Sequence, residues 1–573
     1  MVGIGQIKQK LEFIYGAQLG QETFDKLEKL LLKYAFLKER PPNPAGRFSE
    51  KDAILITYGD QVQQEGQTHL ATLHQFLASH LKGLTNSVHI LPFYPYTSDD
   101  GFSVVDYRQV DANLGDWGDI AVLEGDFKLM FDAVINHISA SSAWFQGFLK
   151  GESLYQDYFL VADPRLDLSG VTRPRTLPLL TAFETAGGRQ HVWTTFSVDQ
   201  IDLNFRNPQL LLDITELLLF YVSKGASLIR LDAIGYLWKE VGTNCIHLPQ
   251  THAVVQLWRA VLDELAPATL LVTETNVPHR DNISYFGDGY NEAQMVYQFP
   301  LVPLTLHTLL TGDSSKLRLW ARDLAAPSAQ TTFFNFLASH DGIGVVPAKG
   351  ILSDAEIENL VATTLQHGGQ VSYKNNPDGS QSPYELNITY FDALSNPTEG
   401  EEIKIKRFMA SQAILLSFQG MPGIYFHSLF GSPSWQEGFA QTGRARTLNR
   451  QKLKLPELEA ALADSSTREA RIFEAYTELL HLRARHKTFH PNAAQELLET
   501  SPAIFALQRT APDGSERILC LLNVTDRVQT LASISSIIGA DHGQEYLDLL
   551  SGIKYRANEA VSLDIYQLLW LQG

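Results

Sequence analysis

The chain has 573 residues, of which 44% are hydrophobic, and it carries a formal net charge of −18 at pH 7. This hydrophobic content supports a large folded core and argues against a disordered chain. The negative charge makes nucleic acid and anionic membrane surfaces poor partners. The sequence shows no N-terminal hydrophobic signal region and no apolar run of the ~18 residues that a membrane-spanning helix needs. We therefore expect a cytoplasmic protein.

The first 50 residues are predicted to form an extension of amphipathic helices, because their apolar residues recur at helical spacing. Short apolar strands then alternate with helical stretches. A helix over 208–224 is predicted between Asn207, which suits an N-cap, and Gly225, which suits a helix end. The predicted barrel strands, in chain order, are 53–58, 88–93, 128–137, 227–232, 270–274, 331–339 and 420–426.

Two segments are too long for simple connections between a strand and a helix. We interpret 138–205 as an inserted domain that walls a cleft, and 342–400 as a long excursion from the barrel. Strand patterns replace helical ones from about residue 489 onward, which predicts a small antiparallel β domain over 489–573. The barrel itself is then expected over 51–137 and 206–488.

Strands that alternate with helices predict parallel βα units. The chain exceeds the ~250 residues of a bare eight-stranded barrel, so added segments are required. The sequence therefore predicts an α/β protein: a (β/α)8 barrel with inserted loop domains, an N-terminal helical extension and a C-terminal antiparallel β domain. In such a barrel the residues that follow the strands meet on one face, where barrel active sites lie.

Polar residues end several of the predicted strands. Arg230 and Asp232 lie two residues apart on one strand, so their side chains share a face. A neighbouring guanidinium favours the ionised carboxylate, which is the state that a glycosidic nucleophile requires. The pair alone is equally compatible with a structural ion pair that closes the strand. The other strand ends carry Asn136, His137, Glu274, His340 and Asp341.

These residues occur in the order of the four signature regions of the α-amylase superfamily, which the chain resembles over nearly its whole length. Within that superfamily the chain is most similar to the sucrose phosphorylase subgroup, and especially to the glucosylglycerate phosphorylases. The resemblance implies reversible phosphorolysis of a small α-glucoside to α-glucose 1-phosphate, by double displacement through a β-glucosyl-enzyme. The segments that carry the subgroup resemblance are 91–107, 172–175, 273–279 and 373–379.

The resemblance implies that Asp232 is the nucleophile and Glu274 the general acid/base. Retaining enzymes place two carboxylates about 5–5.5 Å apart, and neighbouring parallel strands lie ~4.8 Å apart, so residues that end adjacent strands meet this requirement. Asp341 matches the residue that grips sugar hydroxyls and stabilises the transition state. Glu274 needs a raised pKa, which the charges of Asp232 and Asp341 would provide.

The resemblance also implies a closed pocket for a single glucose. Asp100 and Arg446 match the residues that clamp the glucose 4- and 6-hydroxyls and so exclude a longer glucan. His137 and His340 match glucose-binding histidines, although either one taken alone would more often be a core residue. The remaining predicted substrate-binding residues are Arg230 and two members of an aromatic wall, Phe196 and Tyr236.

Phosphate is a co-substrate in this scheme, and we expect no cofactor and no metal. Arg173 and Arg175 stand on the predicted inserted domain, separated by a proline. Arg175 matches the phosphate-binding arginine of sucrose phosphorylases, and a planar guanidinium suits phosphate. A solvated pair of surface arginines is the alternative interpretation.

The acceptor is the least constrained part of the substrate. Sucrose phosphorylases typically carry His two residues after the acid/base, where this chain has Asn276, which argues against fructose. The carboxylate of glycerate would need a cation such as Lys374 or Arg280, whereas Glu385 would oppose an anion and suit the hydroxyls of glycerol. The predicted acceptor-binding residues are Thr275, Asn276, Arg280, Lys374, Ser382, Tyr384 and Glu385.

We expect 2-O-α-glucosylglycerate as the substrate. Phosphorolysis of glucosylglycerol, sucrose or sucrose 6′-phosphate, or a sucrose-type hydrolase or transglucosylase, remains as the alternative. Non-catalytic barrels of this superfamily that assist transporters typically carry a membrane helix and lack the catalytic carboxylates, so that interpretation is disfavoured. The expected partners are a sugar and phosphate, with monomer and homodimer both open. Cys245 and Cys520 are predicted to be buried thiols.

Overall fold

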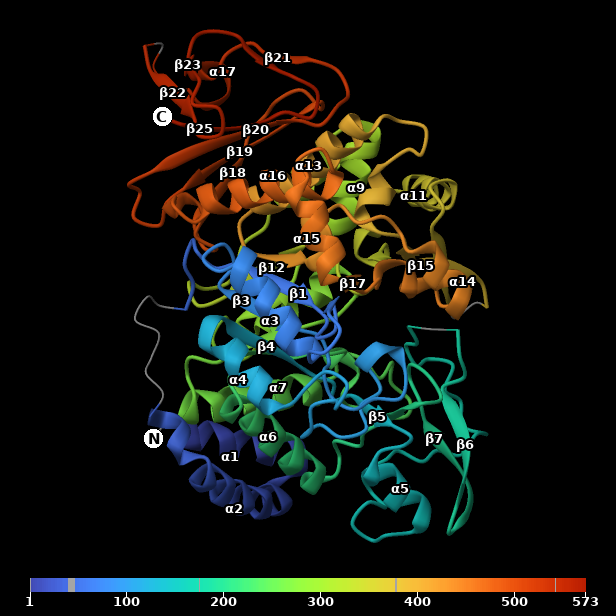
Figure 1. The fold of residues 1–573 in the computed structure, drawn as a ribbon. Coiled ribbons are helices and arrows are strands. Elements are labelled where there is room, and N and C mark those ends of the chain that lie inside the picture. Colours follow the sequence, from blue (N-terminus) through green and yellow to red (C-terminus); the bar gives the residue numbers. More distant parts are fainter. Residues whose placement is uncertain (1, 40–46, 175, 377–378, 540, 542) are drawn as a thin grey trace.

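The computed structural model describes residues 2–39, 47–174, 176–376, 379–539, 541 and 543–573. At its centre lie eight parallel strands: β1 (Ile54–Thr57), β3 (Ser87–Ile90), β4 (Lys128–Ala133), β9 (Ala226–Leu231), β10 (Leu270–Thr273), β11 (Met295–Tyr297), β12 (Thr332–Phe336) and β16 (Met421–Tyr425). They close into a barrel in the order β1-β16-β12-β11-β10-β9-β4-β3, which confirms the predicted (β/α)8 architecture (Figure 1).

Several differences from the predicted strands bear on the site. The strand predicted over 128–137 ends at Ala133, and His137 instead begins the short strand β5 (His137–Ser139). β11 was not predicted, because its apolar run is only three residues long and polar Gln294 and Gln298 flank it. β12 ends at Phe336 instead of Ser339. Asp341 therefore stands at the end of a short loop that follows the strand, at the carboxyl end of the barrel.

Helices surround the barrel and bury its strands. The first turn of α6 (Pro208–Ser223) is capped as predicted, since the Asn207 side chain accepts hydrogen bonds from the backbone N–H groups of Gln209 and Leu210. The chain leaves this helix through Gly225, whose φ of 104° is one that other residues rarely adopt. Other helices of this layer include α3 (His69–His80), α4 (Trp117–Asp126), α7 (Pro249–Leu265), α9 (Leu301–Thr311), α10 (Ser315–Ala321), α13 (Glu401–Ser417) and α16 (Arg468–Arg483).

Two segments build up the face at which the strands end. The first contains β5 (His137–Ser139), α5 (Ala143–Lys150), β6 (Leu180–Thr185), β7 (Gly188–Trp193) and β8 (Gln200–Asp202), with β5 paired to β8 and β6 paired to β7. The second contains β13 (Ile343–Gly344), α11 (Asp354–Gln366), β14 (Gln370–Asn375), β15 (Gln381–Asn387) and α12 (Tyr390–Leu394). Its strands form a sheet in the order β13-β15-β14.

The two ends of the chain pack at opposite ends of the molecule (Figure 1). The N-terminal helices α1 (Val2–Tyr15) and α2 (Ala17–Lys33) lie against α7 and α6, and the Tyr15 hydroxyl donates a hydrogen bond to the carbonyl of Phe205. The C-terminal strands are β18 (Ala494–Leu497), β19 (Ile504–Thr510), β20 (Arg517–Asn523), β21 (Gln529–Leu531), β22 (Glu545–Asp548), β23 (Lys554–Arg556), β24 (Val561–Leu563) and β25 (Leu568–Gln572). Six of them form one antiparallel sheet in the order β18-β19-β20-β25-β22-β23.

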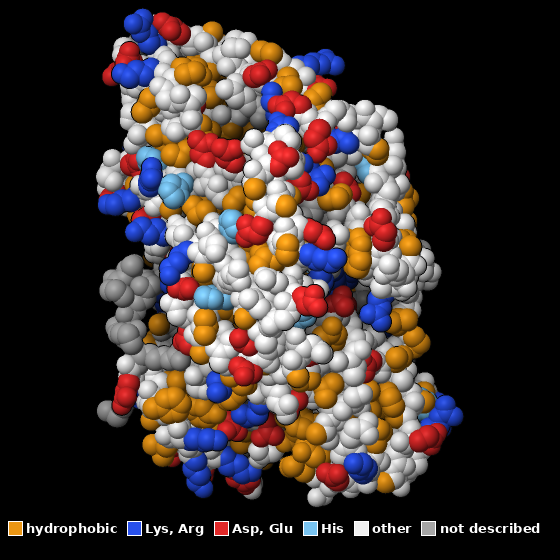
Figure 2. Space-filling model, viewed as in Figure 1, with side chains coloured by type: hydrophobic (Ala, Val, Ile, Leu, Met, Phe, Trp, Pro, Cys, Tyr) orange, Lys and Arg blue, Asp and Glu red, His pale blue; other side chains and the backbone are white. Residues whose placement is uncertain are grey.

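On the face shown in Figure 2, the Lys and Arg side chains of the described residues are interspersed with Asp and Glu side chains. Both cysteines are buried, as predicted. Within the described parts of the chain, no helix combines the length and apolar character needed to cross a bilayer.

Candidate active site

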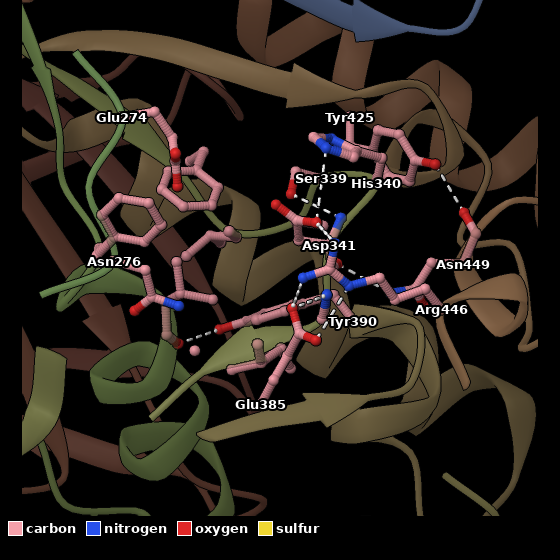
Figure 3. A pocket seen from close by; sticks show the side chains of 18 of the residues that line it. Glu274, Asn276, Ser339, His340, Asp341, Glu385, Tyr390, Tyr425, Arg446 and Asn449 are labelled. Atoms are coloured by element: carbon pink, nitrogen blue, oxygen red, sulfur yellow. Dashed lines mark hydrogen bonds and ion pairs between the residues drawn. The ribbon is translucent and has the colours of Figure 1, made fainter. Parts of the chain in front are cut away.

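A pocket opens at the carboxyl end of the barrel. Figure 3 shows Glu274 and Asn276 on one side of it, and Asp341, Arg446 and Glu385 on the other. Residues from β9, from the loops after β10 and β12, and from β15 line the same cavity. The structure therefore brings the ends of the predicted signature regions to one place.

Arg230 on β9 contacts three carboxylates at the base of the site. Its buried guanidinium donates hydrogen bonds through Nη1 to Asp132, at 2.5 Å, and to Asp232, at 2.9 Å. Its Nη2 lies 3.8 Å from Oε2 of Glu274. The predicted shared face of Arg230 and Asp232 is confirmed, and one guanidinium contacts both catalytic candidates.

Asp232 and Glu274 follow neighbouring strands in register. β9 pairs with β10, and Leu231 is opposite Thr273, so each carboxylate comes one residue after a paired position. The N–H of Ala233 donates a hydrogen bond to Oε2 of Glu274, at 3.1 Å. Ala233 has a φ of 48°, a left-handed conformation that costs energy for a residue other than glycine.

The surroundings of Glu274 favour its protonated form. Burial raises its pKa to about 7, with Asp232 and Asp341 acting in the same direction and Arg230 opposing them. The predicted rise is confirmed, although burial contributes more than the neighbouring charges. Burial also raises the pKa of Asp232, so Arg230 and His137 offset only part of its desolvation. A carboxyl group that keeps its proton near neutral pH suits the general acid.

Asp341 is set to stay ionised. Its carboxylate forms an ion pair with Nη1 of Arg446 at 2.6 Å (Figure 3). Burial opposes ionisation, but Arg446, His340 and Arg450 together hold the pKa of Asp341 well below its usual range. A fixed negative charge at this point can attract the positive charge that develops on a glucosyl ring in the transition state.

Burial favours the neutral form of the two predicted histidines, and contacts with Phe102 hold both rings in place. His340 stacks on Phe102 with ring centroids 4.6 Å apart, and burial lowers its pKa to about 3. Burial also lowers the pKa of His137, whose Nε2 lies 2.9 Å from the carbonyl oxygen of Phe102. The ring of Phe196 lies 5.2 Å from that of His137 and 5.4 Å from that of Tyr236, so the predicted aromatic wall is continuous.

Of the two predicted clamps of the glucose hydroxyls, Arg446 lines the catalytic pocket and Asp100 does not. Asp100 instead forms an ion pair with Nη1 of Arg450 at 2.6 Å, and Asp99 lies 3.6 Å from the same nitrogen. Asp99 lines the catalytic pocket, whereas Asp100 lines a neighbouring hollow. Nη2 of Arg450 is buried without a hydrogen-bond partner among the described residues. The sequence interpretation thus missed Asp99 and Arg450 as candidate sugar-binding groups.

The seven predicted acceptor residues separate into three groups, which line the catalytic pocket, a side chamber, or neither. Asn276, Tyr384 and Glu385 line the catalytic pocket. A side chamber adjoins that pocket and shares Pro174, Asn276 and Tyr384 with it; its lining also includes Arg173, Tyr236, His247, Asp281 and Lys374.

The other three predicted acceptor residues line neither cavity in the described part of the chain. The Thr275 hydroxyl donates to Asn282, at 2.7 Å, and that of Ser382 donates to Asn376, at 3.1 Å. Arg280 is exposed. The phosphate candidate Arg175 lies outside the described residues.

A buried network behind His137 was not predicted. Nζ of Lys239 lies 2.8 Å from both Asp202 and Oδ1 of Asn136, and Nδ2 of Asn136 lies 3.2 Å from Nδ1 of His137. Lys239 follows β9 and Asp202 belongs to β8, so the network joins the barrel to the inserted segment. A buried lysine with a carboxylate partner gives no sequence periodicity by which it could be recognised.

Comparison with known proteins identifies the family to which the chain belongs. Residues 78–345 match the family model for the alpha-amylase catalytic domain. The chain is 54% identical, over 92% of its length and 94% of the relative, to a glucosylglycerate phosphorylase of Allomeiothermus silvanus. It is 32% identical, over 76% of its length and 88% of the relative, to a sucrose phosphorylase of Agrobacterium vitis.

The chain belongs to the α-amylase superfamily, within its sucrose phosphorylase subgroup. A solved structure agrees on the fold: the sucrose 6F-phosphate phosphorylase from Thermoanaerobacter thermosaccharolyticum aligns with a TM-score of 0.72 at 24% identity, over 83% of this chain and 94% of that one. The predicted catalytic and glucose-binding residues Asp232, Glu274, Asp341, His137 and His340 all line one pocket at the carboxyl end of this barrel.

Proposed function

We propose that this protein is a retaining α-glucoside phosphorylase that converts 2-O-α-glucosylglycerate and phosphate into α-glucose 1-phosphate and glycerate. The observation that carries the reaction type is the pair Asp232 and Glu274, which follow paired strand positions and share Arg230, with the pKa of Glu274 raised to about 7. The relative with 54% identity, named glucosylglycerate phosphorylase, supports the choice of substrate.

In the first step, the carboxylate of Asp232 attacks the anomeric carbon and forms the β-glucosyl ester. Glu274 gives its proton to the glycosidic oxygen, so that glycerate leaves as a neutral hydroxyl at that position. Asp341 faces the developing positive charge on the ring. His137, His340, Asp99 and Arg450 are proposed to hold the glucose hydroxyls.

In the second step, a phosphate oxygen attacks the same carbon and displaces Asp232, while Glu274 takes up the phosphate proton. Two inversions restore the α configuration of the donor. The chain is acidic overall, so phosphate needs a local cationic site. We assign that role to Arg175, through its family match, with Arg173 in the side chamber as a second cation.

Changing Arg175 to alanine should reduce phosphorolysis far more than hydrolysis of the same glucoside, because only the first reaction brings phosphate to the site. The two rates are measured as α-glucose 1-phosphate and free glucose formed in one series of phosphate concentrations, and the KM for phosphate should rise. Equal losses in both reactions would show that Arg175 acts only structurally.

The side chamber supports an anionic acceptor. Lys374 is half-buried there and has no carboxylate partner among the described residues; burial and the nearby Lys349 both lower its pKa. An uncompensated cation beside the catalytic pocket of an acidic protein suits a carboxylate ligand. Asp281 also lines the chamber, but its single negative charge is outnumbered by the positive charges of Lys374 and Arg173.

Changing Lys374 to alanine should weaken the binding of glycerate far more than the binding of glycerol. Loss of a hydrogen bond to a charged group costs about 1.5–3 kcal/mol, which raises the KM for glycerate roughly 10- to 150-fold and leaves that for glycerol nearly unchanged. Synthesis from α-glucose 1-phosphate is measured as the release of phosphate, with glycerate, glycerol, fructose and fructose 6-phosphate as acceptors. Arg280→Ala is the matched control, because Arg280 is exposed and lines neither cavity. A wild-type enzyme that prefers glycerol would refute the glycerate assignment while leaving the phosphorylase assignment in place.

A further inference from the structure

Both carboxylate oxygens of Glu385 are already engaged by the protein. Glu385 lies on β15 and is only 3% exposed. Its Oε1 accepts hydrogen bonds from the Gly342 N–H at 2.9 Å and from Nη2 of Arg446 at 3.0 Å, and its Oε2 accepts one from Nε of Arg446 at 3.2 Å. This side-on arrangement fixes the plane of the guanidinium as well as its position.

The other end of the same guanidinium contacts the donor side of the site. Nη1 of Arg446 forms the 2.6 Å ion pair with Asp341, so Arg446 stands between two carboxylates, as Figure 3 shows. Arg446 is also the largest favourable influence on the low pKa of Asp341. The orientation of Asp341 therefore depends on a cation that Glu385 holds.

The backbone reinforces this connection. β13 pairs with β15, and Gly344 lies opposite Glu385 in that pairing. A Cβ atom at Gly342 would come within 2.5 Å of the Leu386 carbonyl oxygen and 2.6 Å of Cγ of Glu385. The residue after Asp341 is thus packed directly against β15, and only glycine fits there.

We propose that Glu385 is a positioning residue for Asp341 and not a ligand of the acceptor. It holds Arg446, and through Arg446 it fixes the carboxylate that faces the glucosyl ring in the transition state. This role is independent of which acceptor the enzyme uses.

A donor without an acceptor group separates the two roles. α-Glucosyl fluoride requires the donor side of the pocket and presents no glycerate or glycerol. Glu385→Ala should lower kcat/KM for α-glucosyl fluoride and for the natural glucoside by a similar factor, about 10- to 100-fold on the scale of a lost charged hydrogen bond. The KM for the acceptor in synthesis should stay close to that of the wild type. Glu385→Gln should recover part of the loss, because its amide oxygen still accepts from Gly342 or Arg446.

Two results would overturn the proposal. An increase in acceptor KM with an unchanged fluoride reaction would make Glu385 an acceptor ligand. Unchanged kinetics in all reactions would show that Arg446 positions Asp341 without a contribution from Glu385.

The matched control is Glu399→Ala, which removes a carboxylate that pairs with both terminal nitrogens of Arg407, at 2.6 and 2.7 Å, away from the pocket. Thermal unfolding of both variants distinguishes lost positioning from lost folding. Arg446→Lys, which keeps the charge and loses the side-on pairing, should reproduce the loss with α-glucosyl fluoride; full activity in that variant would contradict the proposal.

Discussion

Replacing Asp232 with asparagine should abolish glucosyl transfer while the protein stays folded. The amide has the shape of the carboxylate but cannot form the glucosyl ester, so kcat should fall by about 10⁴-fold or more, as when a nucleophile is removed from other covalent enzymes. The oxygen of the introduced amide can still accept a hydrogen bond from Arg230, and Arg230 keeps its 2.5 Å contact with Asp132. Initial rates of α-glucose 1-phosphate formation measure the loss, and circular dichroism with thermal unfolding monitors the fold.

The configuration of the product formed by the wild-type enzyme tests the same mechanism. The first product seen by proton NMR should be α-glucose 1-phosphate, because two displacements at one carbon retain the donor configuration. A β product, or near-normal turnover in Asp232→Asn, would rule out double displacement through Asp232. The ion-pair interpretation of Arg230 and Asp232 predicts the opposite pattern: retained activity and a marked loss of stability.

The alternation of strands and helices made the barrel predictable from sequence, and the family resemblance singled out Asp232 and Glu274 as the candidate catalytic carboxylates. Arg230, Asp232 and Glu274 stand at the ends of apolar runs that are typical of buried strands, and period-2 geometry predicts which side chains share a face. β11 was not predicted from sequence, because three apolar residues between two glutamines give no such pattern. The domain limits at 50, 137, 205 and 488 stay predictions, since strand and helix bounds do not by themselves divide the chain.

Pairing between distant loops was the part that sequence could not supply. Arg446 and Arg450 are four residues apart, and Asp99 and Asp100 are adjacent, so the sequence alone leaves several pairings open. In the structure the two consecutive left-handed residues, with φ of 51° and 49°, send Asp100 toward Arg450 and leave Asp99 on the pocket wall. Backbone conformations of this kind are set by tertiary packing.

The acceptor side shows the same limit. Thr275 and Ser382 lie next to pocket residues in the chain, yet their hydroxyls bond to Asn282 and Asn376. Sequence proximity to an acid/base predicts distance from the reacting atoms but not the direction of a side chain. The side chamber is lined by residues from 172–174, 236–248, 276–281 and 346–384, which are far apart in sequence. A charge such as Lys374 could therefore be proposed from sequence but not placed.

Replacing Glu274 with glutamine should produce a loss that depends on the leaving group. A general acid contributes about 10²- to 10⁴-fold to rate, so cleavage of the natural glucoside should fall by that factor. Fluoride leaves without a proton, so glucosylation of Asp232 by α-glucosyl fluoride should be nearly normal. Phosphate is already anionic, so the variant should still convert α-glucosyl fluoride and phosphate into α-glucose 1-phosphate. Fluoride release and sugar phosphate formation measure the two steps.

The pH dependence gives an independent check on the same residue. The first step needs protonated Glu274, whose pKa burial raises to about 7. Wild-type kcat/KM for the glucoside should therefore decline as pH rises through about 7, because the fraction of protonated acid decreases. The rate with α-glucosyl fluoride should lack this decline, and so should Glu274→Gln with either donor. If wild-type enzyme lost activity at high pH equally with both donors, or if Glu274→Gln lost the fluoride reaction as severely as the glucoside reaction, Glu274 would not be the proton donor. In that case the raised pKa would reflect burial of a structural carboxyl group.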